Sequence, residues 1–206
     1  VYAPTGKDGR LLCQVLQRAQ MTCEVCSSVN ETIDEMYKGV GAVIIADEAL
    51  SIDFLKRVRV FLDSQPNWSD LPFLVLREMA PDTPEMRSRY ILLGNITLLD
   101  RPVRSVTLVS AAISALRART RQYEMREIDR RKDEFLAMLA HELRNPLAPI
   151  SAASELLREP NLAPEKVRHT SEIISRQVRH MTGLIDDLLD VSRVSRGQVT
   201  LDQDVH

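Results

Sequence analysis

The sequence predicts two parts of different class, an α/β domain followed by an all-α part built from long helices. In the first half, short apolar segments alternate with segments of helical periodicity, which is typical of a parallel sheet covered by helices. In the second half, apolar residues repeat in steps of three and four along two long stretches. Residues 103–145 include neither proline nor glycine, so one helix should join the two parts.

Composition and charge argue against several classes of protein. The formal net charge of −2 gives no electrostatic basis for binding nucleic acid or an anionic membrane. No apolar run approaches the roughly 18 residues that a membrane span requires, and no signal peptide is visible. The first residue is not Met and an expected strand begins at once, so we interpret the chain as a fragment and expect a cytoplasmic protein.

Three cysteines are present, an odd number that is typical of a reduced, cytosolic protein without a disulfide framework. Cys23 and Cys26 have the spacing of metal ligands, but no second pair of Cys or His follows nearby. A strand is expected here, and residues three apart on a strand point to opposite faces. We therefore favour structural roles for Cys13, Cys23 and Cys26 over a zinc or redox site, and expect no metal.

Five βα units are expected in the first half, which predicts a doubly wound, flavodoxin-like α/β domain over residues 1–115. Asn30 and Ser51 have the side chains of helix N-caps. Strands are expected at 1–4, 21–26, 42–46, 72–76 and 95–99, and helices at 8–20, after Asn30, after Ser51 and near 84–93. Periodicity predicts inward positions at Leu11, Leu12, Val15, Leu16, Ala19, Ile33, Met36, Tyr37, Phe54, Leu55, Val58, Phe61 and Leu62.

The first half resembles the receiver domain of two-component signalling, and its Leu98-Leu-Asp-Arg101-Pro102-Val matches the end of the fifth strand of that domain. The resemblance implies carboxylates after the first strand that hold Mg²⁺, because this ion prefers carboxylate oxygens. Ala3-Pro4-Thr5-Gly6 stands in that place here.

The other reactive positions of a receiver also differ. Arg77 replaces the hydroxyl residue expected after the fourth strand, and Arg101 replaces the lysine before the proline. Asp47 or Glu48 lies near the place of the acceptor aspartate. We therefore expect a receiver-like domain that docks or signals without being phosphorylated, although both arginines have a plain alternative as surface or packing residues.

Trp68 lies in a proline-flanked segment, Gln65-Pro-Asn-Trp68-Ser-Asp-Leu-Pro72. An exposed aromatic residue in such a loop is one way to contact a partner. Because tryptophan is usually mostly buried, we favour a loop anchor whose indole packs against the sheet.

The first long helix carries a histidine on the face opposite its apolar seam. If the seam supplies heptad positions a and d, His141 falls at f and Asn145 falls at c, one turn along the same outer face. Glu142 follows the histidine directly, and Pro146 lacks the backbone N–H that a helix uses, so a bend is expected there. The seam residues are Leu136, Leu139, Leu143, Pro146, Ile150, Ala153 and Leu157.

These residues, Phe135-x-x-x-x-Ala140-His141-Glu-Leu-Arg-Asn145-Pro146-Leu, resemble the H-box of sensor histidine kinases. The resemblance implies that His141 accepts a phosphoryl group and that Glu142 assists proton removal. It also implies that Asn145 orients the water that hydrolyses a phosphorylated partner, and that Pro146 is a hinge. The alternative is a surface histidine in an ordinary helical bundle.

A second amphipathic helix is expected from 164 to 195, after a loop at 159–163. Its end, Leu184-Ile-Asp-Asp-Leu-Leu-Asp-Val-Ser-Arg193, resembles the second helix of the dimerisation domain in the same family. Because two helices bury two apolar stripes poorly, we expect residues 133–197 to form a homodimeric four-helix bundle. His169 and His180 fall outside the seam and are given no role. The seam residues are Ile174, Val178, Met181, Ile185 and Leu188.

Residues 116–132 are expected to form a helical connector between the two domains. The segment is highly charged, but apolar residues along it favour a weak two-chain coiled coil over a solvated connector. A slide, tilt or change of winding here is a hypothesis for how a signal reaches His141. The coiled-coil positions are Ile113, Leu116, Thr120, Tyr123 and Ile128.

The family resemblance implies a reaction that needs further domains. His141 would accept the γ-phosphoryl group of ATP and pass it to an aspartate on the receiver domain of a response regulator. Mg-ATP would be held by a separate domain of the same protein, to which residues 198–206 would lead, so this fragment should hold no cofactor and should be inactive alone. Two alternatives remain: a passive phosphotransfer relay protein and a non-catalytic dimeric scaffold.

Overall fold

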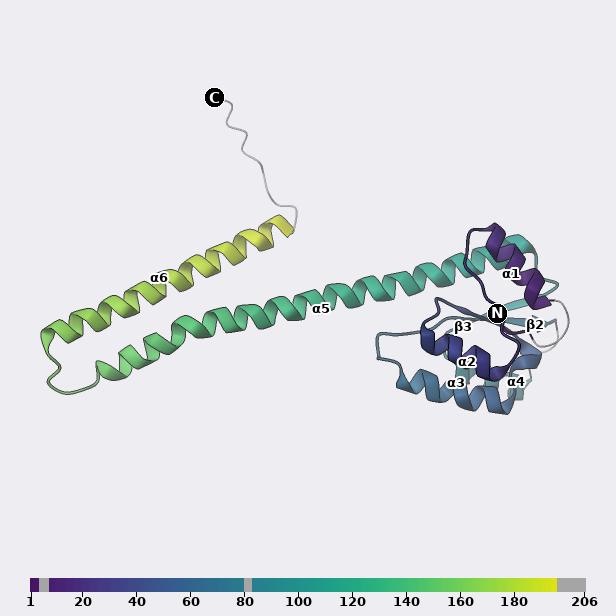
Figure 1. Ribbon diagram of the computed structural model, residues 1–206, viewed down its shortest axis with the longest axis horizontal. Coiled ribbons are helices and arrows are strands. Elements are labelled where there is room, and N and C mark those ends of the chain that lie inside the picture. Colours follow the sequence, from purple (N-terminus) through teal and green to yellow (C-terminus); the bar gives the residue numbers. More distant parts are fainter. Residues whose placement is uncertain (4–7, 80–82, 196–206) are drawn as a thin grey trace, which may run out of the picture. The chain divides into compact units, whose positions relative to one another are not determined.

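The computed structural model describes residues 1–3, 8–79 and 83–195 of the chain (Figure 1). The chain divides into two compact units, Val1–Asp129 and a second unit that begins at Arg130. One helix, α5 (Ser105–Leu156), contributes residues to both units.

The first unit contains a parallel sheet of three strands in the order β1-β2-β3. These strands are β1 (Val43–Ala46), β2 (Phe73–Glu78) and β3 (Ile96–Arg101). All four residues of β1 are buried, as expected for a parallel strand covered on both faces. The helices of this unit, besides the start of α5, are α1 (Asp8–Arg18), α2 (Val29–Lys38), the 3₁₀ turn η1 (Asp47–Ala49), α3 (Ile52–Ser64) and α4 (Pro84–Leu93).

Two apolar clusters lie on opposite faces of the sheet, because successive side chains of a strand point to opposite sides. On one face Ile45 and Val75 pack with residues of α2, α3 and α4, including Phe54. On the other face Ile44 and Leu74 pack with residues of α1 and α5. The unit is therefore a three-layer α/β arrangement, and the start of α5 is part of its core.

The predicted strands at 1–4 and 21–26 are reduced to single-residue bridges. Tyr2 bridges Cys26 on one side and Ile45 on the other, both in parallel orientation. Residues 21–25 are not in a strand. A strand needs a hydrogen-bonding partner along its length, and among the described residues Tyr2 supplies one position of it. Pro4 lies outside the described residues.

Two helix predictions were wrong in detail. The N-cap of α2 is Ser28 rather than Asn30: its Oγ accepts the Glu31 N–H, and the Glu31 carboxylate accepts the Ser27 N–H. Leu11 and Tyr37, predicted to point inward, are exposed. Tyr37 instead meets Phe61 edge-on, with ring centroids 5.0 Å apart.

Other local predictions are confirmed. The Ser51 hydroxyl accepts the Phe54 N–H and caps α3, whose Phe54, Val58 and Phe61 are buried. The helix predicted near 84–93 is α4, with those bounds and a Thr83 cap.

The second unit is a helical hairpin. The end of α5 is followed by a short loop, and α6 (Pro164–Ser195) runs back along it (Figure 1). Among residues 130–188, the part of this unit whose side chains the structure describes, Pro146, Ala153 and Thr170 are buried. No helix within the described ranges is long and apolar enough to cross a membrane.

Candidate functional site

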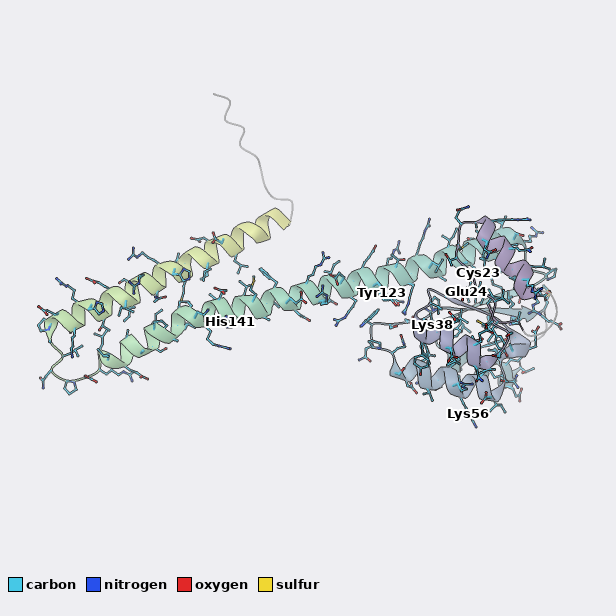
Figure 2. The ribbon with its side chains drawn as sticks, viewed as in Figure 1. Cys23, Glu24, Lys38, Lys56, Tyr123 and His141 are labelled. Atoms are coloured by element: carbon cyan, nitrogen blue, oxygen red, sulfur yellow. The ribbon has the colours of Figure 1, made fainter. Side chains whose placement is uncertain are left out.

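His141 lies on the exposed surface of α5 (Figure 2). Asn145, four residues later and so one turn along the same face, is also exposed. Its amide nitrogen Nδ2 lies 3.5 Å from His141 Nδ1. When the amide donates to Nδ1, that nitrogen is the acceptor and the ring hydrogen is on Nε2. A phosphoryl group needs a ring nitrogen with a free lone pair, so a reaction at Nε2 requires the other tautomer, in which the hydrogen is on Nδ1.

Glu142 is exposed beside the histidine. Adjacent residues on a helix point about 100° apart, so their side chains do not face each other. The carboxylate therefore lies where it can meet a group that approaches His141 from solvent, rather than against the ring itself.

Pro146 lies on the opposite, buried side of α5, so the histidine face and the packing face are separate. The helix continues through Pro146 and Pro149. Because neither proline has an N–H, the carbonyls of Glu142 and Asn145 lose their normal helical partners four residues later. The two missing hydrogen bonds weaken the helix within the turn that follows His141, which is a physical basis for the expected hinge.

The predicted seam of α6 is divided between two faces. Ile174, Met181 and Leu188 are half-buried within the hairpin. Val178 and Ile185 are 48% and 45% exposed. On α5, Leu136 and Leu147 are similarly open, and Leu157, which was predicted in the seam and directly follows α5, is also exposed. The hairpin therefore leaves a second apolar face uncovered. His169 and His180 are exposed, and no role is assigned to either.

The carboxyl ends of the three strands bring together the residues predicted to replace receiver chemistry. Arg77 pairs with Asp100 at 2.7 Å, and Arg101 pairs with Glu48 at 3.0 Å. Glu48, one of the two acids expected near the acceptor position, is thus engaged by Arg101, which was predicted to stand in the place of a lysine. No group of three His, Cys, Asp or Glu side chains that could hold a metal occurs among the described residues, while Pro4–Gly6 lie outside them.

The three cysteines are free thiols. The Cys13 thiol donates to the Cys23 carbonyl oxygen at 3.0 Å. Burial raises the pKa of the Cys23 thiol to about 12, and burial also raises the pKa of Cys26. Thiols with raised pKa values stay protonated and react slowly, as expected of structural cysteines.

Trp68 packs against α5 rather than against the sheet, which corrects the predicted anchor. Its ring meets that of Tyr123 at a centroid distance of 5.1 Å. Arg119 is 6% exposed, and its guanidinium lies over the Tyr123 ring and donates to the Ser69 hydroxyl at 2.8 Å. We call the contacts between residues 65–70 and residues 119–123 the loop–helix clamp.

Gln122 completes the loop–helix clamp. Its Oε1 accepts the Asp70 N–H at 3.0 Å and its Nε2 donates to the Asp70 carbonyl at 3.1 Å. Sequence reasoning missed both Gln122 and Arg119, because a polar residue in a charged helical segment normally lies in solvent. Part of the predicted connector is therefore held by the first unit.

Comparisons with known proteins match the second unit to one family. A family model described as the His Kinase A (phospho-acceptor) domain matches residues 131–197. Hybrid signal transduction histidine kinase D of Dictyostelium discoideum is 35% identical over 78 residues, which are 38% of this chain and 5% of that protein. The chain thus spans a small part of the length of this relative.

One solved structure is similar in fold. The crystal structure of NtrX from Brucella abortus in complex with ADP matches with a TM-score of 0.52 and 12% sequence identity. The match covers 64% of this chain and 29% of that one. At this level of identity the likeness concerns the fold alone.

Proposed function

Because residues 131–197 are the dimerisation and phosphotransfer domain of a sensor histidine kinase, we propose that His141 accepts the γ-phosphoryl group of ATP and passes it to an aspartate of a response regulator. The observation that carries the proposal is the placement of His141 inside the matched domain. It is exposed there on a helix whose opposite face, at Pro146, is buried. A phosphoryl donor and a phosphoryl acceptor both need to reach this nitrogen from solvent.

The chemistry follows from the contacts of the imidazole. Nε2 attacks the γ-phosphorus, a N–P bond forms, the bond to the bridging oxygen breaks, and ADP leaves. Nε2 attacks through its free lone pair, so the ring hydrogen is on Nδ1 in this scheme. The exposed Glu142 carboxylate would turn toward the ring and accept that proton as the N–P bond forms. Mg-ATP would be held by a separate domain of the same protein.

Asn145 is also proposed to take part in dephosphorylation of the response regulator. After the regulator has docked on His141, an exposed amide one turn away is placed to orient a water molecule toward a phosphoaspartate. The full protein would then act as a phosphatase as well as a kinase.

The second unit is proposed to dimerise into a four-helix bundle. Val178, Ile185, Leu136 and Leu147 are each more than 40% exposed on the hairpin. A second copy would cover this face, and a symmetric dimer is the commonest way to do so.

The first unit is proposed to be a receiver-like domain that is not phosphorylated. Adding the Tyr2 and Cys26 bridges to the sheet gives the segment order Cys26–Tyr2–β1–β2–β3. In chain order this is 2-1-3-4-5, the order of flavodoxin-like folds. The ion pair between Glu48 and Arg101 supports chemical silence, because it occupies one of the two carboxylates expected near the acceptor position.

Two other functions use the same helices, a passive phosphotransfer relay and a non-catalytic scaffold. They are separated by the phosphoryl donor. We would incubate the chain with γ-labelled ATP and a histidine-kinase ATP-binding domain, and separately with a phosphorylated receiver domain. Acid-labile label from ATP supports the kinase, label from the receiver alone supports the relay, and no label from either supports the scaffold.

A further inference from the structure

The first unit carries an exposed apolar groove between α3 and α4, two helices that pack beside each other. Leu55, which is buried, lies at its base, and its walls include Ile52 and Val60 of α3 and Leu92 of α4. Ile52 is 69% exposed and Val60 is 66% exposed. Aliphatic side chains left this open on adjacent helices mark a contact surface. We call this feature the α3–α4 groove.

The sequence of α3 separates the groove residues from the core. Phe54, Val58 and Phe61 face the sheet and are buried. Positions four apart stack on a helix surface, so residues 52, 56 and 60 form a row along α3. Ile52 and Val60 belong to this row and not to the buried face. Ile52 and Val60 therefore contribute little to the stability of the unit that carries them. Their apolar character calls for another explanation.

The charges around the groove have one sign. Its lining includes three basic side chains, Lys56, Arg59 and Arg89, and no acidic one. Arg59 pairs with Asp63, which neutralises one of the three charges. Lys56 on the α3 wall and Arg89 on the α4 wall are the other two cations, on the two sides of the apolar base. The pKa of the Glu85 carboxyl is lowered mainly by its own backbone N–H, and Arg89 lies close enough to help lower it.

We propose that the α3–α4 groove binds an amphipathic helix of a partner protein, with an apolar stripe in steps of three and four and Asp or Glu residues flanking it. Two helices packed side by side form a natural seat for a third, which inserts apolar anchors into the groove. Acidic flanks on that helix would meet Lys56 on one wall and Arg89 on the other. Charge complementarity of this kind selects a partner and speeds its association.

A second copy of the chain fits the groove less well. A symmetric contact places the same patch against itself, so Lys56 and Arg89 would face their own counterparts without a neutralising acid in the lining. A membrane surface also fits less well, because Leu55 lies at the base of a concave groove rather than on a protruding face. Both occupants are outcomes of the test below.

The test uses the whole chain and a fluorescein-labelled helical peptide with Leu at heptad a and d positions and Glu beside them. Two control peptides have the same composition in scrambled order, or Lys in place of Glu. We expect saturable binding of the Glu peptide by fluorescence anisotropy. Lys56→Glu combined with Arg89→Glu should weaken it about tenfold or more, and so should Val60→Asp. Arg87→Glu, an exposed change on α4 outside the groove lining, should leave it within about twofold.

Several results would overturn the proposal. These are absence of saturable binding, equal binding of a control peptide, and unchanged affinity in the groove variants. If the parent chain does not bind the peptide and the groove variants lose self-association, the groove belongs to a second copy. If the parent chain does not bind the peptide and the variants lose binding to anionic vesicles, the groove belongs to a membrane. If Val60→Asp fails to fold by circular dichroism, the charge-reversed pair decides, since both of its side chains are on the surface. The assay is independent of His141 phosphorylation.

Discussion

Replacing Arg119 with alanine should release α5 from the loop–helix clamp. The residue is 6% exposed, and its guanidinium donates to Ser69 Oγ, Gln122 Oε1 and Tyr123 Oη at 2.8, 2.9 and 3.2 Å. It also lies 4.9 Å from the centre of the Tyr123 ring. The change therefore removes three hydrogen bonds and a stacking contact at once.

The net cost is smaller than the sum of these contacts. A hydrogen bond involving a charged group contributes about 1.5–3 kcal/mol, but keeping a guanidinium out of water offsets most of three such bonds. We expect the free energy of unfolding of the first unit to fall by about 2 kcal/mol. With a urea m-value of about 2 kcal/mol/M, the midpoint should fall by about 1 M.

The chain supplies its own probe for this measurement. Its single tryptophan, Trp68, lies in the clamp against Tyr123, so its fluorescence during urea unfolding reports on this unit. Arg121→Ala, an exposed change on the same helix, is the matched control and should shift the free energy by less than about 0.5 kcal/mol. Equal midpoints for the two variants would refute the clamp.

Three further predictions concern the hairpin and the thiols. The double variant Val178→Asp, Ile185→Asp should be a monomer, because the new charges enter the proposed dimer interface. Light scattering measures the mass, and the exposed Arg176→Asp, as the control, should remain a dimer. A dimer mass for the double variant would contradict the bundle. In a kinase assay, Glu142→Gln should slow phosphorylation of His141 about 10²–10⁴-fold, and Asn145→Ala should leave that rate unchanged. In a phosphatase assay, Asn145→Ala should slow dephosphorylation of the regulator. Slow phosphorylation in Asn145→Ala with slow dephosphorylation in Glu142→Gln would exchange the two roles. The rate of Cys23 alkylation, followed by mass spectrometry, should still increase above pH 10, because burial raises the pKa of this thiol to about 12. An ordinary thiol has a pKa of about 8.5, so its alkylation rate levels off near pH 9.5. The same plateau for Cys23 would contradict its burial.

The sequence predicted best the elements whose pattern is local. The apolar run of β1, the Ser51 cap and the start of α4 at Pro84 all depend on neighbouring residues, and all are present. The 164–195 helix has the predicted bounds. In each case the periodicity and the capping chemistry point to the same structure, so little was left for tertiary contacts to decide.

The predictions failed where long-range contacts decide the structure. The strand at 21–26 depended on a partner strand, and Tyr2 pairs with Cys26 at one position. The seam of α6 was predicted as one surface, but packing within the hairpin covers Met181 and leaves Val178 open. Arg119 looked like a connector charge, and its burial depends on a loop that lies 50 residues earlier in the chain.

The candidate site was readable from sequence because its residues are close together on one helix. His141, Glu142 and Asn145 lie within two turns of α5, so helical geometry alone placed His141 and Asn145 on one exposed face. The structure added the 3.5 Å approach of Asn145 Nδ2 to His141 Nδ1, which spacing alone does not give.

Mapping of the phosphoryl group tests the central claim most directly. The chain would be incubated with Mg-ATP and a histidine-kinase ATP-binding domain, and phosphohistidine would be located by mass spectrometry under neutral conditions. His141→Gln is compared with His180→Gln, a change at another exposed histidine that has no assigned role. The account predicts phosphate on His141, its retention in His180→Gln and its loss in His141→Gln with the helical content unchanged. Phosphorylation that persists in His141→Gln, or that maps to His169 or His180, would contradict it.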